Sequence, residues 1–221
     1  MASHSVTLRH HFETSEQQKD ASTIGMWMFL VTEIMFFGGL FMAYIAYRGA
    51  YPDAFAAGSQ KLNIVYGTIN TAVLICSSLT MAMAVHSAAL GKKNLIILFL
   101  ILTLMLGGVF LGIKAVEYHD KYVGHEIPGA NFHPELDNKN VSVNNVSLYF
   151  ALYFGMTGLH ALHMIVGVGL LLFLIFKTAK GAYTAHWHTP IELFGLYWHF
   201  VDIVWIFLFP LLYLIDLHPG K

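Results

Sequence analysis

Five stretches of the chain are apolar over the length that a helix needs to cross a lipid bilayer. They cover about residues 23–47, 63–88, 94–117, 145–176 and 191–215. About 20 mostly apolar residues in a helix span a hydrocarbon core of about 30 Å. Apolar and polar residues do not alternate, as the run 94–102 illustrates, which disfavours the strands of a membrane barrel. We therefore predict an all-α integral membrane protein, a bundle of five transmembrane helices whose backbone groups are satisfied within each segment.

The polar segments predict how the chain is arranged around the membrane. Residues 1–22 are polar and precede an apolar stretch too long for the core of a signal peptide, so we expect a short aqueous tail. The connection over about 119–144 contains glycine, proline and an excess of acidic residues, and we expect an aqueous loop there. Residues 23–221 then form a single five-helix transmembrane domain.

The placement of lysine residues indicates an orientation in the membrane. Lys92 and Lys93 fill a very short turn, and Lys177 and Lys180 flank a helix end on the same side. Cytoplasmic loops are enriched in Lys and Arg. We therefore expect the N-terminal tail to be cytoplasmic and the C-terminus to lie on the periplasmic or outer side.

The composition supports a membrane protein and excludes several other classes. Hydrophobic residues make up 57% of the chain and charged residues 11%, whereas soluble domains have roughly 25% charged residues. The net charge is −1, with no basic stripe, so we expect no nucleic-acid partner. The single cysteine, Cys76, excludes an internal disulfide and a cysteine-rich metal site.

Ionisable residues inside the apolar segments are the first candidates for function, because they are costly in lipid unless they are paired. Glu33 lies about ten residues into the first segment, roughly 15 Å deep at 1.5 Å per residue. His160 and His163 lie three residues apart near the middle of the fourth segment. We expect a hydrogen bond from Glu33 to His160 or His163, in a buried polar network with a proton-linked or lipid-linked role.

Two further sets of polar residues are candidates for other roles. Two i, i+3 pairs on the third and fifth segments are expected to pin helices together or, at the helix end, to reach the interface: Lys114, Glu117, His199 and Asp202. Three residues near the inner surface are candidates for binding lipid headgroups or collecting protons, with a solvated loop as the alternative: His186, His188 and Glu192.

Thirteen histidines also suggest a metal or haem site. Two histidines on facing helices can hold a haem, and a di-iron site in a helix bundle uses Glu-x-x-His pairs. No such pair occurs in the five segments. We predict no metal site, with a free-standing haem or di-iron membrane enzyme as an alternative.

Three motifs resemble one known family when the segments are taken in order. The fifth segment contains Tyr-Trp-His-Phe-Val-Asp-Ile-Val-Trp at 197–205, the fourth Gly-Leu-His-Ala-Leu-His at 158–163, and the first Leu-Val-Thr-Glu-Ile-Met-Phe-Phe at 30–37. Together the matches extend over about residues 23–215. The chain resembles subunit III of haem–copper oxidases, the cytochrome c oxidase subunit III family. It lacks the first two helices of the seven-helix members and resembles the short five-helix bacterial form.

This resemblance implies a non-catalytic subunit of a proton-pumping terminal oxidase. Such a subunit packs on subunit I, stabilises it and supports proton uptake during aerobic respiration. The haems and copper belong to subunit I, while subunit III binds structural phospholipids and no cofactor of its own. Subunit II and other subunits are further partners. The complex is the enzyme, cytochrome-c oxidase, in a bacterial or archaeal plasma membrane.

The same residues leave other functions open. An accessory subunit of a quinol oxidase or of a nitric-oxide reductase system has the same fold. A proton-coupled transporter using Glu33 is disfavoured because the chain shows no inverted repeat.

Overall fold

The computed structural model describes residues 12–129, 132–133, 141–185 and 187–214. Five helices in this part of the chain are long and apolar enough to cross a membrane, which confirms the predicted fold class. A sixth, short helix was not predicted. In chain order the helices are α1 (Ser15–Ala50), α2 (Pro52–Gln60), α3 (Ile64–Ala89), α4 (Lys93–Val123), α5 (Val143–Ala179) and α6 (Thr189–Tyr213).

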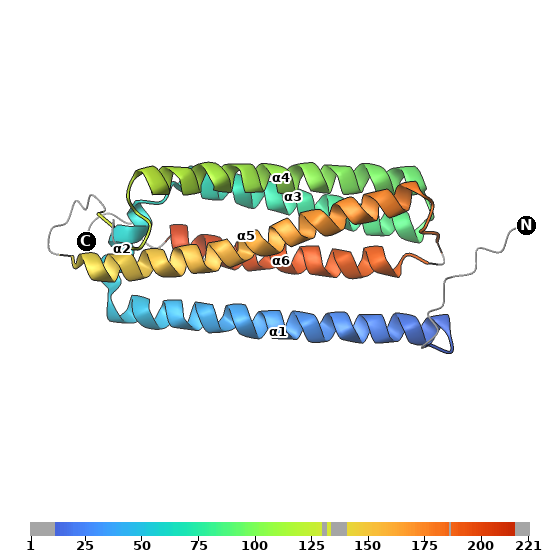
Figure 1. Ribbon diagram of the computed structural model, residues 1–221, viewed down its shortest axis with the longest axis horizontal. Coiled ribbons are helices and arrows are strands. Elements are labelled where there is room, and N and C mark those ends of the chain that lie inside the picture. Colours follow the sequence, from blue (N-terminus) through green and yellow to red (C-terminus); the bar gives the residue numbers. More distant parts are fainter. Residues whose placement is uncertain (1–11, 130–131, 134–140, 186, 215–221) are drawn as a thin grey trace, which may run out of the picture.

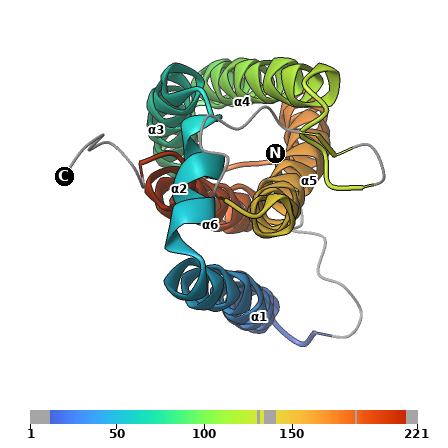
Figure 2. The same cartoon turned by 90° about the vertical axis from the view of Figure 1, so that its left-hand side faces the viewer.

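Helices α3, α4, α5 and α6 form a compact bundle, and α1 lies along one side of it (Figures 1 and 2). In the described part of the chain α1 contacts α2, α5 and α6 and makes no contact with α3 or α4. Most of its apolar side chains are therefore exposed on the molecular surface. In a membrane this surface faces lipid or another protein.

Trp198 and Trp205 are the largest fully buried side chains of the described residues, and Trp198 joins several helices. A Cβ atom added at Gly107 of α4 or Gly167 of α5 would approach its ring to 3.0 or 2.8 Å, so both helices need glycine to pack this closely. The indole nitrogen donates a hydrogen bond of 2.8 Å to the Ser77 hydroxyl of α3. One side chain of α6 thus contacts three neighbouring helices.

The short helix α2 lies across one end of the bundle, between α1 and α6 (Figure 2). Pro52 at its first position and Asp53 in its first turn favour a helix start there. Gly58 packs directly on the ring of Tyr149 in α5. The Ser59 hydroxyl donates to the Leu212 carbonyl at 2.9 Å. This contact joins α2 to the end of α6.

Side chains from other helices satisfy the carbonyl groups at the C-terminal end of α6. The last four carbonyls of a helix have no partner within it. The Tyr44 hydroxyl of α1 donates to the Leu211 carbonyl at 2.5 Å. The Tyr149 hydroxyl of α5 donates to the Leu212 carbonyl at 2.9 Å. Both bonds therefore attach α1 and α5 to the last turn of α6.

The observed helices extend beyond several predicted boundaries. Helix α1 begins at Ser15, inside the predicted tail, because the Thr14 side chain accepts a hydrogen bond from the Gln17 amide and caps the first turn. Helix α4 continues to Val123, inside the predicted loop. Residues 1–11, 130–131, 134–140 and 215–221 of the predicted tail, loop and last helix lie outside the described residues.

Candidate functional site

Glu33 of α1 and His163 of α5 form a direct pair between two helices. The Glu33 Oε2 atom lies 3.2 Å from Nε2 of His163, and both side chains are mostly buried. Glu33 occupies the middle of α1, 18 residues from Ser15 and 17 from Ala50. The pair is therefore deep in the membrane-spanning region, and it links α1 to the bundle.

A hydrogen bond within α5 orients the His163 ring toward Glu33. Nδ1 lies 2.8 Å from the carbonyl oxygen of Leu159, which can only accept, so Nδ1 carries a hydrogen and donates it. Nε2 is therefore the ring nitrogen that faces the Glu33 carboxyl group.

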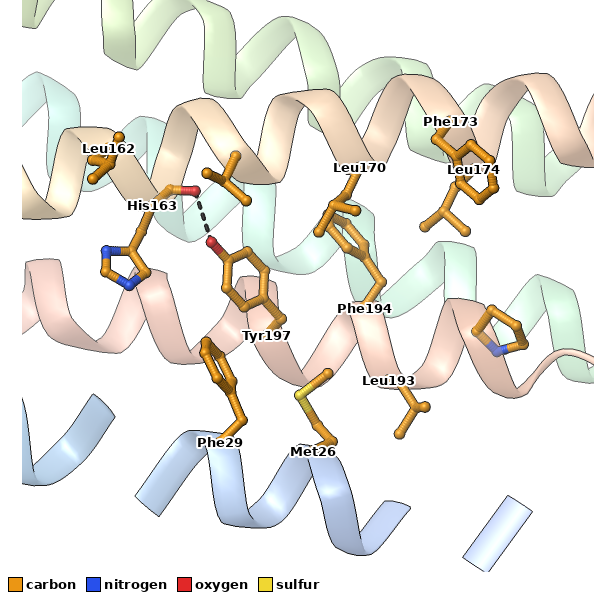
Figure 3. Close-up of a pocket in the computed structure, with 12 residues that line it drawn as sticks. Met26, Phe29, Leu162, His163, Leu170, Phe173, Leu174, Leu193, Phe194 and Tyr197 are labelled. Atoms are coloured by element: carbon orange, nitrogen blue, oxygen red, sulfur yellow. Dashed lines mark hydrogen bonds between the residues drawn. The ribbon is translucent and has the colours of Figure 1, made fainter. Parts of the chain in front are cut away.

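An apolar cavity of about 570 Å³ begins beside His163 and continues between α1, α5 and α6. Figure 3 shows Met26 and Phe29 of α1 directed toward α6, where the Phe29 and Tyr197 ring centroids are 6.1 Å apart. The Tyr197 hydroxyl donates to the His163 carbonyl at 2.8 Å. Aliphatic side chains of α5, including Leu170, supply another wall. A hydrocarbon chain matches the chemistry of this lining.

His160 does not share the environment of His163. Successive residues of a helix are rotated by about 100° about its axis. His160 and His163, three residues apart, therefore point in directions about 60° apart around α5. Only His163 reaches Glu33, so the expected alternative with His160 is wrong. The His160 ring lies between Phe110 and Trp205, and neither ring nitrogen has a hydrogen-bond partner among the described residues.

Lys114 and Glu117 form a buried ion pair at 2.9 Å, with side chains only 3% and 2% exposed. They pair with each other and do not extend to the interface. The ammonium group also donates to the hydroxyls of Tyr153 at 3.2 Å and Tyr213 at 3.1 Å. Both tyrosines donate to Oε1 of Glu117, at 2.9 and 2.5 Å respectively. The aromatic ring of Trp205 lies 5.2 Å from the ammonium nitrogen. The cluster therefore joins α4, α5 and α6.

His199 and Asp202 of α6 both have Ser78 of α3 as their polar neighbour. Nδ1 of His199 is 2.7 Å from the Ser78 hydroxyl, which is an interhelical bond of the expected kind. Asp202 is buried, and the same hydroxyl group is adjacent to its carboxyl group. The pinning role expected of Asp202 stays a prediction.

The amino-acid sequence was compared with known protein families. A family described as "Cytochrome c oxidase subunit III" matches residues 5–216. The chain belongs to this family.

Relatives of this subunit III family member come from bacteria and animals. Cytochrome c oxidase subunit 3 of Thermostichus vulcanus is 32% identical over 204 residues, 91% of this chain and 90% of the relative. That of Corynebacterium diphtheriae is 32% identical over 196 residues, 88% of each chain. That of Coturnix japonica is also 32% identical, over 92% of this chain but 72% of the bird protein. The chain is thus a subunit of a haem–copper oxidase and a multi-pass membrane protein.

Two of the residues expected from the sequence near the inner surface, His188 and Glu192, form a small polar cluster. Nε2 of His188 lies 3.0 Å from the Glu192 carboxylate one helical turn later. Lys19 of α1 lies 4.0 Å from the same carboxylate, which connects α1 to the start of α6. His186, the third candidate, lies outside the described residues.

Several partners of the candidate residues were not found from the sequence. Tyr153, Tyr197 and Tyr213 bond to predicted site residues, yet a tyrosine in an apolar helix is also typical of packing and interface belts. Within the described ranges, no three His, Cys, Asp or Glu side chains gather into a metal-binding group. The absence of a metal site remains an expectation.

Proposed function

We propose that this chain is a non-catalytic scaffold subunit of a bacterial cytochrome c oxidase, in the plasma membrane with its N-terminus cytoplasmic. It packs on subunit I, which carries the haems and copper, stabilises it and supports proton uptake. The observation that carries the proposal is the use of the buried charged groups to join helices. Glu33 of α1 lies 3.2 Å from His163 of α5, and Lys114 and Glu117 bond to tyrosines of α5 and α6.

The proposed role in proton uptake rests on the Glu33–His163 pair. The two groups lie 3.2 Å apart at the middle of the membrane-spanning region, beside a cavity, and we propose that they share one proton. A carboxyl group in this arrangement exchanges its proton with His163 without creating net charge in lipid. We propose that the pair limits changes of charge near a proton path in the neighbouring subunit, and that it carries no redox centre of its own.

The apolar cavity is proposed to hold an acyl chain of a structural phospholipid. Phe173 of α5 lines the cavity, and the ammonium of Lys177 lies 5.5 Å from the centre of the Phe173 ring. Lys177 belongs to the last turn of α5, where its charge reaches the headgroup region. The apolar cavity matches the acyl chain of a phospholipid, and the Lys177 ammonium beyond it matches the phosphate of the headgroup.

Removal of this chain from the purified oxidase tests the scaffold role. The depleted complex is expected to retain its haem content and initial rate of oxygen consumption, but to complete fewer turnovers before inactivation. Adding the chain back should restore the lifetime. An immediate loss of oxygen reduction with the haems intact would contradict a non-catalytic role, and so would an unchanged lifetime.

Blocking the cavity tests the lipid site separately. Val166 lines the cavity, and Val166→Trp places an indole in the space assigned to the acyl chain. Leu172→Trp is the matched control, because Leu172 is an equally exposed residue of α5 outside the lining. Native mass spectrometry of the complex should show one phospholipid fewer for Val166→Trp than for the control. Equal lipid content would refute the site.

A further inference from the structure

Three lysines from two neighbouring turns lie close together at one end of the bundle. Lys92 and Lys93 lie at the start of α4, after the turn from α3, and Lys180 follows the last residue of α5. Figure 1 shows the ends of these three helices meeting. The Lys93 ammonium donates a hydrogen bond of 2.7 Å to the Ala179 carbonyl, which joins the two turns. We refer to Lys92, Lys93 and Lys180 as the basic cluster.

No acidic side chain of the described residues forms an ion pair with the basic cluster. The described acidic residues at this end of the bundle lie at or just before the starts of α1 and α6: Glu13, Glu16, Asp20 and Glu192. Helix α1 makes no contact with α3 or α4 in the described part of the chain. Glu192 is already paired with His188. The positive charge of the basic cluster is therefore not neutralised by the described residues.

Most hydrogen-bond donors of the basic cluster have no partner among the described residues. Each ammonium group has three donors and no acceptor. Lys93 uses one donor for the Ala179 carbonyl, whereas Lys92 and Lys180 have no side-chain hydrogen bond within the described ranges. All three side chains are exposed. The arrangement is suited to an anion with several acceptor oxygens, such as a phosphate group.

The position of Lys180 places the basic cluster at the boundary between water and the apolar surface of α5. Its ammonium nitrogen lies 4.2 Å from the centre of the Phe176 ring. Phe176 is 56% exposed and belongs to the last turn of this spanning helix. Lysine side chains at such helix ends keep their charge at the membrane interface. A ligand bound there meets cationic donors on one side and an exposed aromatic ring on the other.

We propose that the basic cluster binds the headgroup of an anionic phospholipid, whose acyl chains lie along Phe176 and the neighbouring exposed surface of α5. The phosphate supplies the acceptor oxygens and the negative charge that the lysines lack. Free inorganic phosphate would leave Phe176 uncovered, and a zwitterionic headgroup would bring its own cation against the lysines. Lysines near a membrane surface each favour an anionic lipid by about fivefold. The site should therefore select headgroups with a net negative charge.

This site lies apart from the apolar cavity beside His163. Lys177, three residues before Lys180, lies over the ring of Phe173, which lines the cavity. Neither Phe176 nor the basic cluster belongs to that lining among the described residues. The phospholipid at the basic cluster is thus a second one, and its binding does not depend on the first. An acidic segment of another subunit would also neutralise the lysines; the exposed, apolar position of Phe176 favours the lipid, and crosslinking distinguishes the two.

Site-specific photocrosslinking tests the lipid site. A benzophenone amino acid replaces Phe176, and the full chain, with any subunits that copurify with it, is reconstituted in vesicles with equal parts of phosphatidylglycerol and phosphatidylcholine. Mass spectrometry of the crosslinked chain should show mostly phosphatidylglycerol adducts. Equal adducts of the two lipids, an adduct with another subunit in place of lipid, or no adduct would overturn the inference.

Lysine substitutions test the charge selection in the same assay. Lys180→Gln should lower the ratio of phosphatidylglycerol to phosphatidylcholine adducts by about fivefold, whereas Lys180→Arg keeps the charge and should keep most of the ratio. Lys19→Gln is the matched control, because Lys19 lies at the same end of the bundle but 4.0 Å from Glu192 of α6. An equal ratio for Lys180→Gln and this control would contradict the inference.

Added salts separate the lipid from free phosphate. Inorganic phosphate and sodium chloride at equal ionic strength should lower the adduct ratio equally, because both only screen the charges. A selective loss with inorganic phosphate would assign the basic cluster to the free ion and overturn the lipid assignment. Val166→Trp, which blocks the apolar cavity, should leave the ratio unchanged. A chain that does not copurify with a haem-bearing subunit contradicts the proposed function, whereas equal lipid adducts contradict only this second site.

Discussion

The Lys114–Glu117 cluster gives a quantitative prediction for the stability of the bundle. All three donors of the Lys114 ammonium are used, by Glu117 at 2.9 Å, Tyr153 at 3.2 Å and Tyr213 at 3.1 Å. The substitution Lys114→Met keeps an unbranched side chain that is one heavy atom shorter, and it removes these three bonds. It also leaves the buried carboxylate of Glu117 without its positive partner.

The expected effect is large because both partners are buried. Removing one member of a buried ion pair costs about 3–5 kcal/mol, whereas replacing both members by apolar residues is often close to neutral. A change of 1 kcal/mol shifts the midpoint by about 2–4 °C in a chain of this size. Lys114→Met should therefore lower the thermal midpoint by roughly 6–20 °C. The double variant Lys114→Met with Glu117→Met should recover part of that loss.

Thermal unfolding in detergent, followed by circular dichroism, measures these midpoints. The matched control is Lys19→Met, since Lys19 lies 4.0 Å from Glu192 and its side chain is 53% exposed. An exposed pair of this kind contributes about 0–1 kcal/mol. If Lys114→Met unfolded at the temperature of the control, the buried ion pair would not stabilise the bundle. A double variant that loses as much as the two single variants together would also contradict a stabilising coupling between Lys114 and Glu117.

Three other substitutions test separate parts of the structure. Glu33→Gln removes the ionisable carboxyl and should shorten the turnover lifetime of the oxidase while leaving its initial rate and haem content unchanged; a complete loss of oxygen consumption would contradict this. Gly58→Val places a side chain against the Tyr149 ring and should destabilise the chain by about 1–3 kcal/mol, whereas Gly39→Val, with open space around it, should cost less in the same thermal scan. His160→Phe removes two buried nitrogens that lack partners in the described residues and should keep or raise the thermal midpoint; a clear drop would show that His160 has a partner.

The spanning helices are predictable because membrane burial leaves a strong signal in the sequence. Each of the five segments is apolar over about 20 residues or more, and each corresponds to one helix. Helix α2 is a different case. Its nine residues are too few to produce a periodic pattern, although Pro52 and Asp53 are typical of a helix start. What stabilises it is tertiary contact with Tyr149 and the end of α6, which the sequence does not reveal.

Which buried polar side chains pair with each other depends on how each helix is rotated about its own axis. The sequence places Glu33, His160 and His163 near one depth, but it leaves open which histidine faces α1. The roughly 60° between the two histidines decides this, and only the packed structure fixes that angle. For Lys114 and Glu117, the i, i+3 spacing predicts the pair itself. It does not predict the surrounding tyrosines, which come from helices far away in the sequence.

Purification of the tagged chain in a gentle detergent tests the central claim, membership of an oxidase as a scaffold without its own redox centre. The optical spectrum and mass spectrum of the eluate are recorded before and after the chain is stripped from the complex. We predict a large haem- and copper-bearing subunit in the eluate and a haem-free spectrum for the separated chain. A chain that purifies alone, or one that keeps haem or iron after separation, would contradict it.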